Sequence, residues 1–168
     1  SVGELNKNKN HEIIVRAVAK LKNTNIHYFI AGEGNLKYYL KKLAVELNVD
    51  KQVHLLGYRS DIVELNNCAD IFAFPSIREG LGLAAIEAMA AGKPIITSNT
   101  RGINDYSKNG VTGFKYQYND INGFANGINI LLTDPSLIKQ MSSNCYESSL
   151  SFDKRRSYEI LKSVYEKL

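Results

Sequence analysis

Short apolar runs alternate along the chain with segments in which apolar residues recur every three or four positions. The helical spacing predicts helices over about 11–21, 35–47, 61–67, 82–91, 121–132, 135–150 and 153–168, with Asn35 capping the second. The continuous runs, rich in β-branched and aromatic residues, predict strands over 26–31, 53–56, 70–74, 94–98 and, more weakly, 113–116.

This alternation indicates the fold class. Strands that are apolar throughout and separated by helices are typical of a parallel sheet covered on both faces. No repeat, low-complexity linker or internal boundary interrupts the pattern. The sequence therefore predicts one domain over 1–168, an α/β fold with a Rossmann-like, doubly wound parallel sheet.

Composition narrows the classes of protein. The 168 residues are 44% hydrophobic, and 21 Lys and Arg against 17 Asp and Glu leave a net charge of +4. That mild excess lacks the clustering of a nucleic-acid groove, so no nucleic-acid partner is expected.

No apolar run approaches the roughly 20 residues of a membrane span, so membrane contact would be peripheral, near 154–156. We expect reduced thiols and a cytoplasmic location, at most at the inner face of the membrane, because Cys68 and Cys145 are far apart and no signal peptide is present.

The first residues, Ser1-Val2-Gly3, resemble the end of a buried strand, and no Met precedes them. We therefore expect the chain to be a piece of a longer protein. The three histidines have no metal-ligand spacing with the cysteines, so no metal is expected.

Glycines follow most of the predicted strands within a few residues. Because the carboxyl ends of parallel strands share one edge, and ligands bind at that edge in open α/β sheets, these glycines indicate a binding edge. The alternative is that they only end strands and turn corners. The positions are Gly3, Gly32, Gly34, Gly57, Gly80, Gly82 and Gly102.

The segment SIREGLGL, residues 76–83, is more informative. A strand ends at Pro75, the loop carries Glu79, and a glycine-rich turn opens a helix that carries Glu87 about one turn later. A helix N-terminus suits a diphosphate, and carboxylates bind vicinal sugar hydroxyls, so this arrangement fits a nucleotide diphosphate attached to a sugar. The alternative is that both acids only complement the helix dipole.

The pair Glu79 and Glu87 forms an E-x7-E motif within S-x-x-E-G-x-G-L-x-x-x-E-A-M-A-x-G-x-P. With the opening VGELNKNKNHEIIVRA and the segments IAGEGNL, VHLLGYRSDI and NGVTGF, the chain resembles the family 4 retaining glycosyltransferases of the GT-B fold. The resemblance covers nearly the whole chain and is to their C-terminal, nucleotide-sugar-binding domain.

The resemblance implies roles for individual residues. Glu79 would be the catalytic-site acid that contacts the donor sugar, and Glu87 would bind the nucleotide ribose. Lys9 would bind phosphate, with Lys7 as the alternative. The glycine-rich turn, with Gly80, Gly82 and Leu83, would present N–H groups to the diphosphate. The loop after the strand 53–56, with Gly57, Tyr58 and Arg59, would hold the base.

The sequence departs from the family pattern at two positions. Glu4 stands where the family usually has Arg, and we hypothesise that Arg78 reaches back to supply the missing guanidinium. Asn10 stands where the family usually has Gly, and Asn tolerates the left-handed conformation that such a turn needs.

The resemblance implies a parent protein that transfers a sugar, with retention, from a UDP- or GDP-linked donor to an acceptor glycan or lipid-linked glycan, in bacterial exopolysaccharide or capsule synthesis. No cofactor or metal is expected. The terminal helix, 153–168, would cross to a missing N-terminal domain, and the fragment alone would be inactive. The alternatives are a non-catalytic nucleotide-sugar-binding module and, with less support from the E-x7-E motif, a GT-B epimerase.

Overall fold

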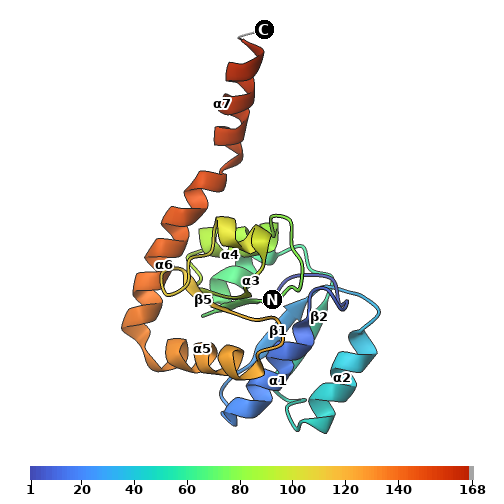
Figure 1. Cartoon of the computed structure of the whole chain (residues 1–168). Helices are drawn as coiled ribbons and strands as arrows, with labels where there is room; N and C mark the ends of the chain where they lie inside the picture. Colours follow the sequence, from blue (N-terminus) through green and yellow to red (C-terminus); the bar gives the residue numbers. More distant parts are fainter. Residues whose placement is uncertain (167–168) are drawn as a thin grey trace.

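The structure, a computed structural model, describes residues 1–166 apart from the side chains at positions 157 and 160. Helices and strands alternate through the first two thirds of the chain, and helices follow (Figure 1). The strands are β1 (Tyr28–Ala31), β2 (Val53–Gly57), β3 (Phe72–Phe74), β4 (Ile95–Ser98) and β5 (Gly113–Tyr116). The helices are α1 (His11–Leu21), α2 (Lys37–Glu46), α3 (Ile62–Cys68), α4 (Leu83–Ala90), α5 (Ile121–Thr133), α6 (Pro135–Ser149) and α7 (Lys154–Tyr165), with 3-10 turns at Arg101–Asp105 and Leu150–Phe152.

All strand pairs between these elements are parallel. β1 pairs with β2, placing Ile30 opposite Leu55, and β4 lies between β3 and β5, placing Ile96 opposite Phe114. The predicted α/β class with parallel strands is therefore confirmed. The expected single sheet is found as two, with strand orders β1-β2 and β3-β4-β5.

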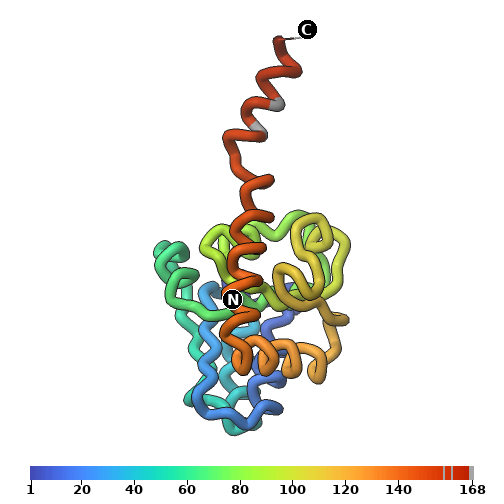
Figure 2. Tube along the Cα trace, turned by 90° about the vertical axis from the view of Figure 1, so that its left-hand side faces the viewer, coloured from blue at the N-terminus to red at the C-terminus, as the bar shows by residue number. Residues whose placement is uncertain are grey.

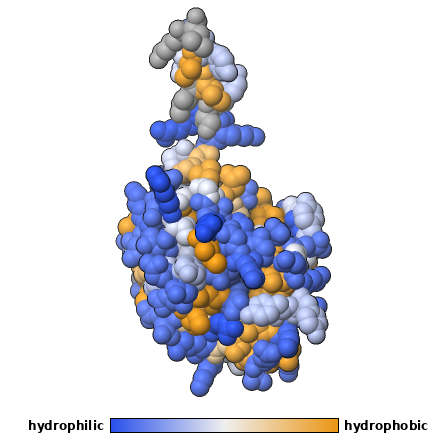
Figure 3. Space-filling view, turned by 45° about the vertical axis from the view of Figure 1, so that its right-hand side comes forward, coloured by the Kyte–Doolittle hydropathy of each residue, from blue (hydrophilic) through white to orange (hydrophobic). Residues whose placement is uncertain are grey.

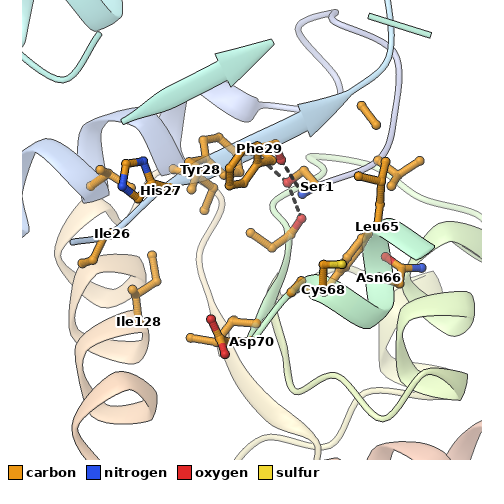
Figure 4. A pocket seen from close by; sticks show the side chains of 18 of the residues that line it. Ser1, Ile26, His27, Tyr28, Phe29, Leu65, Asn66, Cys68, Asp70 and Ile128 are labelled. Carbon is orange, nitrogen blue, oxygen red and sulfur yellow. Dashed lines mark hydrogen bonds between the residues drawn. The ribbon is translucent and has the colours of Figure 1, made fainter. Parts of the chain in front are cut away.

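Ser1 to Gly3 lie in the gap between the two sheets. The Ser1 amine donates to Phe29 O (2.9 Å), Ala31 N donates to Ser1 O (3.0 Å) and Gly3 N donates to Ala31 O (2.9 Å), the pattern of a parallel ladder. Toward β3, Ser1 Oγ donates to Ala73 O (2.5 Å). Beyond Ser1 the gap is a cavity of about 490 Å³, lined by Ile26, Phe29 and Ile71 among others (Figure 4).

Helices cover both faces of the strands, as expected for a doubly wound fold. On one side α1, α2 and α5 pack together, and on the other α3, α4 and α6 do so (Figure 1). The first core includes Ile14, Ile30, Leu40 and Phe124, and the second includes Phe72, Met89, Ile95 and Cys145. Both cysteines are free thiols.

Several predicted ends are wrong by one or two residues. β1 begins at Tyr28, two residues later than expected, because its ladder starts where Tyr28 faces Val53. The predicted cap Asn35 is also wrong. Leu36 caps α2, because its carbonyl accepts the first helical hydrogen bond from Leu40 N (2.9 Å); its own N–H donates to Leu5 O (2.9 Å) and ties the helix start to the first loop.

The last helix, α7, follows α6 and extends away from the body (Figures 1 and 2). Its apolar side chains are exposed, including Tyr158, Leu161 and Tyr165, and apolar colour marks this projection in Figure 3. The predicted helix over 153–168 is thus present at Lys154–Tyr165, and 167–168 lie outside the described residues. No helix among residues 1–166 is long and apolar enough to cross a bilayer.

Candidate functional site

Asparagines shape the loop between Gly3 and α1. Lys9 N donates to Asn6 Oδ1 (2.9 Å), and Asn8 exchanges two hydrogen bonds with the backbone of Arg78, at 3.0 and 3.1 Å. Asn10 has a φ of 53° and donates through Nδ2 to Pro75 O (3.2 Å), which confirms its predicted left-handed conformation. These bonds fix the loop that carries Lys9 against the loop after β3. Asn6 and Asn8 are missing from the sequence-based site, although their alternation in NKNKN could have indicated a bonded turn.

Lys9 and Glu79, 70 residues apart in the sequence, meet at this junction. Lys9 Nζ donates to Glu79 Oε2 at 2.7 Å, and the exposed fractions of the two side chains are 22% and 16%. The ammonium also lies 4.9 Å from the centre of the Phe74 ring, a favourable cation–π arrangement. The two side chains therefore form a mostly buried ion pair at the carboxyl end of β3.

The start of α4 lies in the same loop. Gly82 caps the helix with a φ of 72°, and a methyl group there would lie 2.6 Å from Tyr106 Oη and 2.8 Å from Phe74 Cε1. Only glycine fits this position. The first-turn N–H groups of a helix have no intrahelical acceptors, and the helix dipole favours an anion there. Leu83 and Glu87 are exposed on this helix.

The glycines do gather at one edge, as predicted. Gly3 and Gly32 are linked through Ala31, and Gly32 N donates to Gly57 O at 2.8 Å. A second group forms where Gly102 packs directly on the backbone of Gly80. The Lys9 side chain, which packs against Gly3 and bonds Glu79, joins the two groups.

Other predicted residues lie at this edge without contacting the Lys9–Glu79 pair directly. Tyr58 is 80% exposed, and the Arg59 guanidinium binds Asp61 (Nε–Oδ1 2.7 Å). Arg78 is held through its backbone, and its side chain is exposed. Glu4 is exposed and accepts a hydrogen bond from Asn6 Nδ2 (2.8 Å).

Tyr106 is part of the site and is absent from the sequence-based interpretation. It is 2% exposed and lies under the turn that opens α4. Burial, and secondarily the charge of Glu79, raises the pKa of its hydroxyl, which therefore stays protonated at neutral pH. No sequence pattern marks it, because an aromatic residue after a short 3-10 turn is usually plain core.

No group of three or more His, Cys, Asp or Glu side chains within the described residues is placed to hold a metal ion. At the junction of the first loop and α4, the chemistry available is that of the Lys9 ammonium, the Glu79 carboxylate and a helix start with free backbone N–H groups.

A parallel α/β domain with this site at the carboxyl edge of its strands has the architecture of the C-terminal, Rossmann-like half of GT-B glycosyltransferases. The chain belongs to the family "Glycosyl transferases group 1", whose model matches residues 1–148.

Individual relatives agree with this assignment. The chain is 34% identical over 164 residues to EpsD of Bacillus subtilis, which is named as a glycosyltransferase, covering 96% of this chain and 43% of EpsD. It is 39% identical over 119 residues to the Escherichia coli UDP-Gal:alpha-D-GlcNAc-diphosphoundecaprenol alpha-1,3-galactosyltransferase, covering 70% of this chain and 30% of that enzyme.

Among solved structures, Anabaena Alr3699/HepE matches with a TM-score of 0.91 and 25% identity, covering 99% of this chain and 48% of HepE. HepE has been solved with UDP and with UDP-glucose. The chain therefore spans less than half the length of each of these three relatives.

Proposed function

We propose that this chain is the donor-binding half of a retaining glycosyltransferase that uses a nucleotide-diphosphate-sugar. The observation that carries the proposal is the Lys9–Glu79 pair, 2.7 Å apart, beside the glycine-capped start of α4. The ammonium and the helix start both favour an anion, and the carboxylate favours hydroxyl groups. A sugar attached to a diphosphate presents these two chemistries next to each other.

In this proposal Lys9 and the N–H groups at Gly82 and Leu83 bind the diphosphate, with Gly80 completing the turn. Glu79 orients the donor sugar and Glu87 binds the ribose. The base lies against Gly57, Tyr58 and Arg59, and the exposed Arg78 approaches the phosphates in place of the Arg that Glu4 replaces. Catalysis is chiefly electrostatic, because cationic and N–H groups fixed in place stabilise the charge of the departing diphosphate. No metal or cofactor takes part.

The acceptor is bound outside this chain, by an N-terminal domain that α7 contacts through its exposed apolar side chains. The E. coli relative is named for a UDP-linked donor and a lipid-diphosphate-linked acceptor, and HepE has been solved in complex with UDP-glucose. These names support a UDP-sugar donor and a lipid-linked glycan as acceptor, with other glycans as the alternative. In this proposal the reaction takes place at the cytoplasmic face of the membrane, in exopolysaccharide synthesis. The isolated chain would bind donor and transfer nothing.

Calorimetry and thermal shift with UDP and GDP test this proposal on the chain and on the full-length protein. UDP is expected to raise the melting temperature, because a ligand of the folded state stabilises it by mass action. Glu87→Gln should weaken UDP binding by about tenfold, since hydrogen bonds to a charged group are worth about 1.5–3 kcal/mol. Glu64→Gln, an exposed acid on α3, serves as the control. Absence of binding by any nucleoside diphosphate contradicts the proposal.

A non-catalytic nucleotide-sugar-binding module is the second candidate, and the acid at Glu4 favours it. Donor hydrolysis by the full-length protein separates the two. Turnover by the wild-type protein supports the transferase. Donor binding without turnover in the wild-type protein, together with turnover by the Glu4→Arg variant, supports the module.

A further inference from the structure

The Tyr106 hydroxyl is a buried polar group without a hydrogen-bond partner among the described residues. Tyr106 is 2% exposed and its ring packs edge-on against Phe152, with ring centres 6.0 Å apart. Within the described residues, Oη makes no hydrogen bond. Buried hydroxyl groups almost always have a partner, because leaving one unpaired costs free energy. This hydroxyl is therefore available to donate a hydrogen bond to a neighbouring acceptor.

The surroundings of Oη indicate which group that partner is. A methyl group on Gly82 would lie 2.6 Å from Tyr106 Oη and 3.1 Å from Glu79 Cγ, so the hydroxyl and the Glu79 side chain flank the same point. The negative charge of Glu79 already acts on the phenol, helping burial to raise its pKa. The hydroxyl therefore keeps its proton and can donate it in a hydrogen bond.

The Glu79 carboxylate accepts a hydrogen bond from Lys9 Nζ. If Lys9 binds the donor diphosphate, as the proposed function requires, phosphate oxygens compete with Glu79 for the same ammonium. The carboxylate then loses a charged partner in a half-shielded position, where an unpaired charge is costly.

We propose that Tyr106 is a positioning residue that replaces Lys9 as the hydrogen-bond partner of Glu79 when the donor binds. Its Oη donates to the Glu79 carboxylate, which keeps that carboxylate directed at the sugar hydroxyls while Lys9 binds phosphate. The proton stays on the phenol throughout, so the step is an exchange of hydrogen-bond partners. The inference rests on the proposed function and adds a specificity role for the sugar.

The chain offers a matched control. Tyr28 is also buried, but its hydroxyl already has partners in Ser1 Oγ (2.8 Å) and His11 Nδ1 (3.2 Å). Tyr28→Phe removes a paired hydroxyl away from Glu79, and Tyr106→Phe removes the unpaired one beside it.

The experiment measures dissociation constants in the full-length protein for UDP and for the tightest of UDP-glucose, UDP-galactose and UDP-N-acetylglucosamine. For Tyr106→Phe we expect UDP-sugar affinity to fall by about tenfold, the effect of one hydrogen bond to a charge. UDP affinity should fall less, because UDP presents no sugar hydroxyls for the Glu79 carboxylate to bind. In a Glu79→Gln background, Tyr106→Phe should cause a much smaller loss. Tyr28→Phe should leave the ratio of the two affinities unchanged.

A purely structural role for Tyr106 would change the melting temperature and leave that ratio unchanged, and this result overturns the inference while the proposed function stands. An equal loss in the wild-type and Glu79→Gln backgrounds also overturns it. Failure of the wild-type protein to bind any of these nucleotides overturns the proposed function and the inference together.

Discussion

Gly102 sets the position of the backbone that carries Glu79. A methyl group at Gly102 would lie 1.9 Å from Gly80 O and 2.4 Å from Glu79 O, both of them main-chain atoms that cannot rotate away. The 3-10 turn Arg101–Asp105 therefore supports the Glu79 loop from below through a contact that only glycine allows.

Gly102→Ala is expected to lower the free energy of unfolding by about 1–3 kcal/mol, the usual cost of overpacking, and to weaken UDP binding as the loop shifts. Urea unfolding and calorimetry measure the two effects. Gly80→Ala is the stability control, because a methyl group there meets nothing within 4 Å. Equal destabilisation by both substitutions would show that the close contact is unimportant.

His11 makes stability depend on pH. Burial lowers its pKa to about 4, and the positive charges of the Ser1 amine and Lys9 act in the same direction. The usual value is about 6.5. Between these values the unfolded chain binds more protons than the folded one, so stability is present above pH 6.5 and is lost as the pH falls toward 4.

His11→Gln should flatten this dependence while Gln keeps a hydrogen bond within reach of Tyr28. From pH 7 to 4.5 we expect the variant to lose on the order of 2 kcal/mol less stability than wild type, at about 1.4 kcal/mol per pH unit. Urea unfolding at the two pH values measures the difference. Parallel pH profiles for the two proteins would rule out His11 as the cause.

At the residue scale, the sequence identified groups that sit in a recognisable spacing. Glu79 and Lys9 were predicted to serve one site, and the structure pairs them. Tyr106 was not predictable, since its hydroxyl lies near the Glu79 side chain only through tertiary packing against Gly82, which no local pattern records. The side chains of Arg59 and Glu4 are oriented by hydrogen bonds to Asp61 and Asn6, and these bonds form only once the loops are folded.

At the element scale, hydrophobic periodicity predicted the type and order of the helices and strands well, and the residues at which they begin and end less well. The cores of β3 and β4 were evident because they are buried on both faces, whereas strand ends depend on where a partner strand begins. Helix starts behave similarly. The start of α2 is tied to the first loop by the bond from Leu36 N to Leu5 O, whereas α5 begins at a local cap, in which Asp120 Oδ1 accepts from Gly123 N (2.8 Å).

Asp120→Ala should therefore destabilise the protein by about 1 kcal/mol, the typical cost of losing a helix cap. The melting temperature and the urea midpoint should both fall, because α5 packs its buried face against α1. Asn119→Ala, one residue earlier and exposed, is the control and should leave both unchanged. A similar effect from the two substitutions would contradict the capping role.

At the scale of the whole molecule, the edge of β1 and the edge of β3 are separated by a gap about one strand wide. Ser1–Gly3 already run parallel to β1 inside it, and the cavity beyond Ser1 is lined mainly by apolar side chains (Figure 4). The Ser1 amine is buried there, and this burial lowers its pKa to about 5. The sequence could not reveal the gap, because the apolar pattern of each strand is the same whether the strands form one sheet or two.

An apolar, β-branched extension of about five residues ahead of Ser1 is therefore expected to stabilise the molecule. It would continue the ladder along β1, offer hydrogen bonds to β3 and replace the buried amine by an amide. The melting temperature should rise by about 2–4 °C for each 1 kcal/mol that the added hydrogen bonds and apolar burial contribute in a domain of this size. An extension of equal length with alternating prolines cannot donate to both strands and serves as the control. Equal melting temperatures for the two extensions, or unchanged amide exchange at Ala73 and Phe29, would show that the gap does not accept a strand.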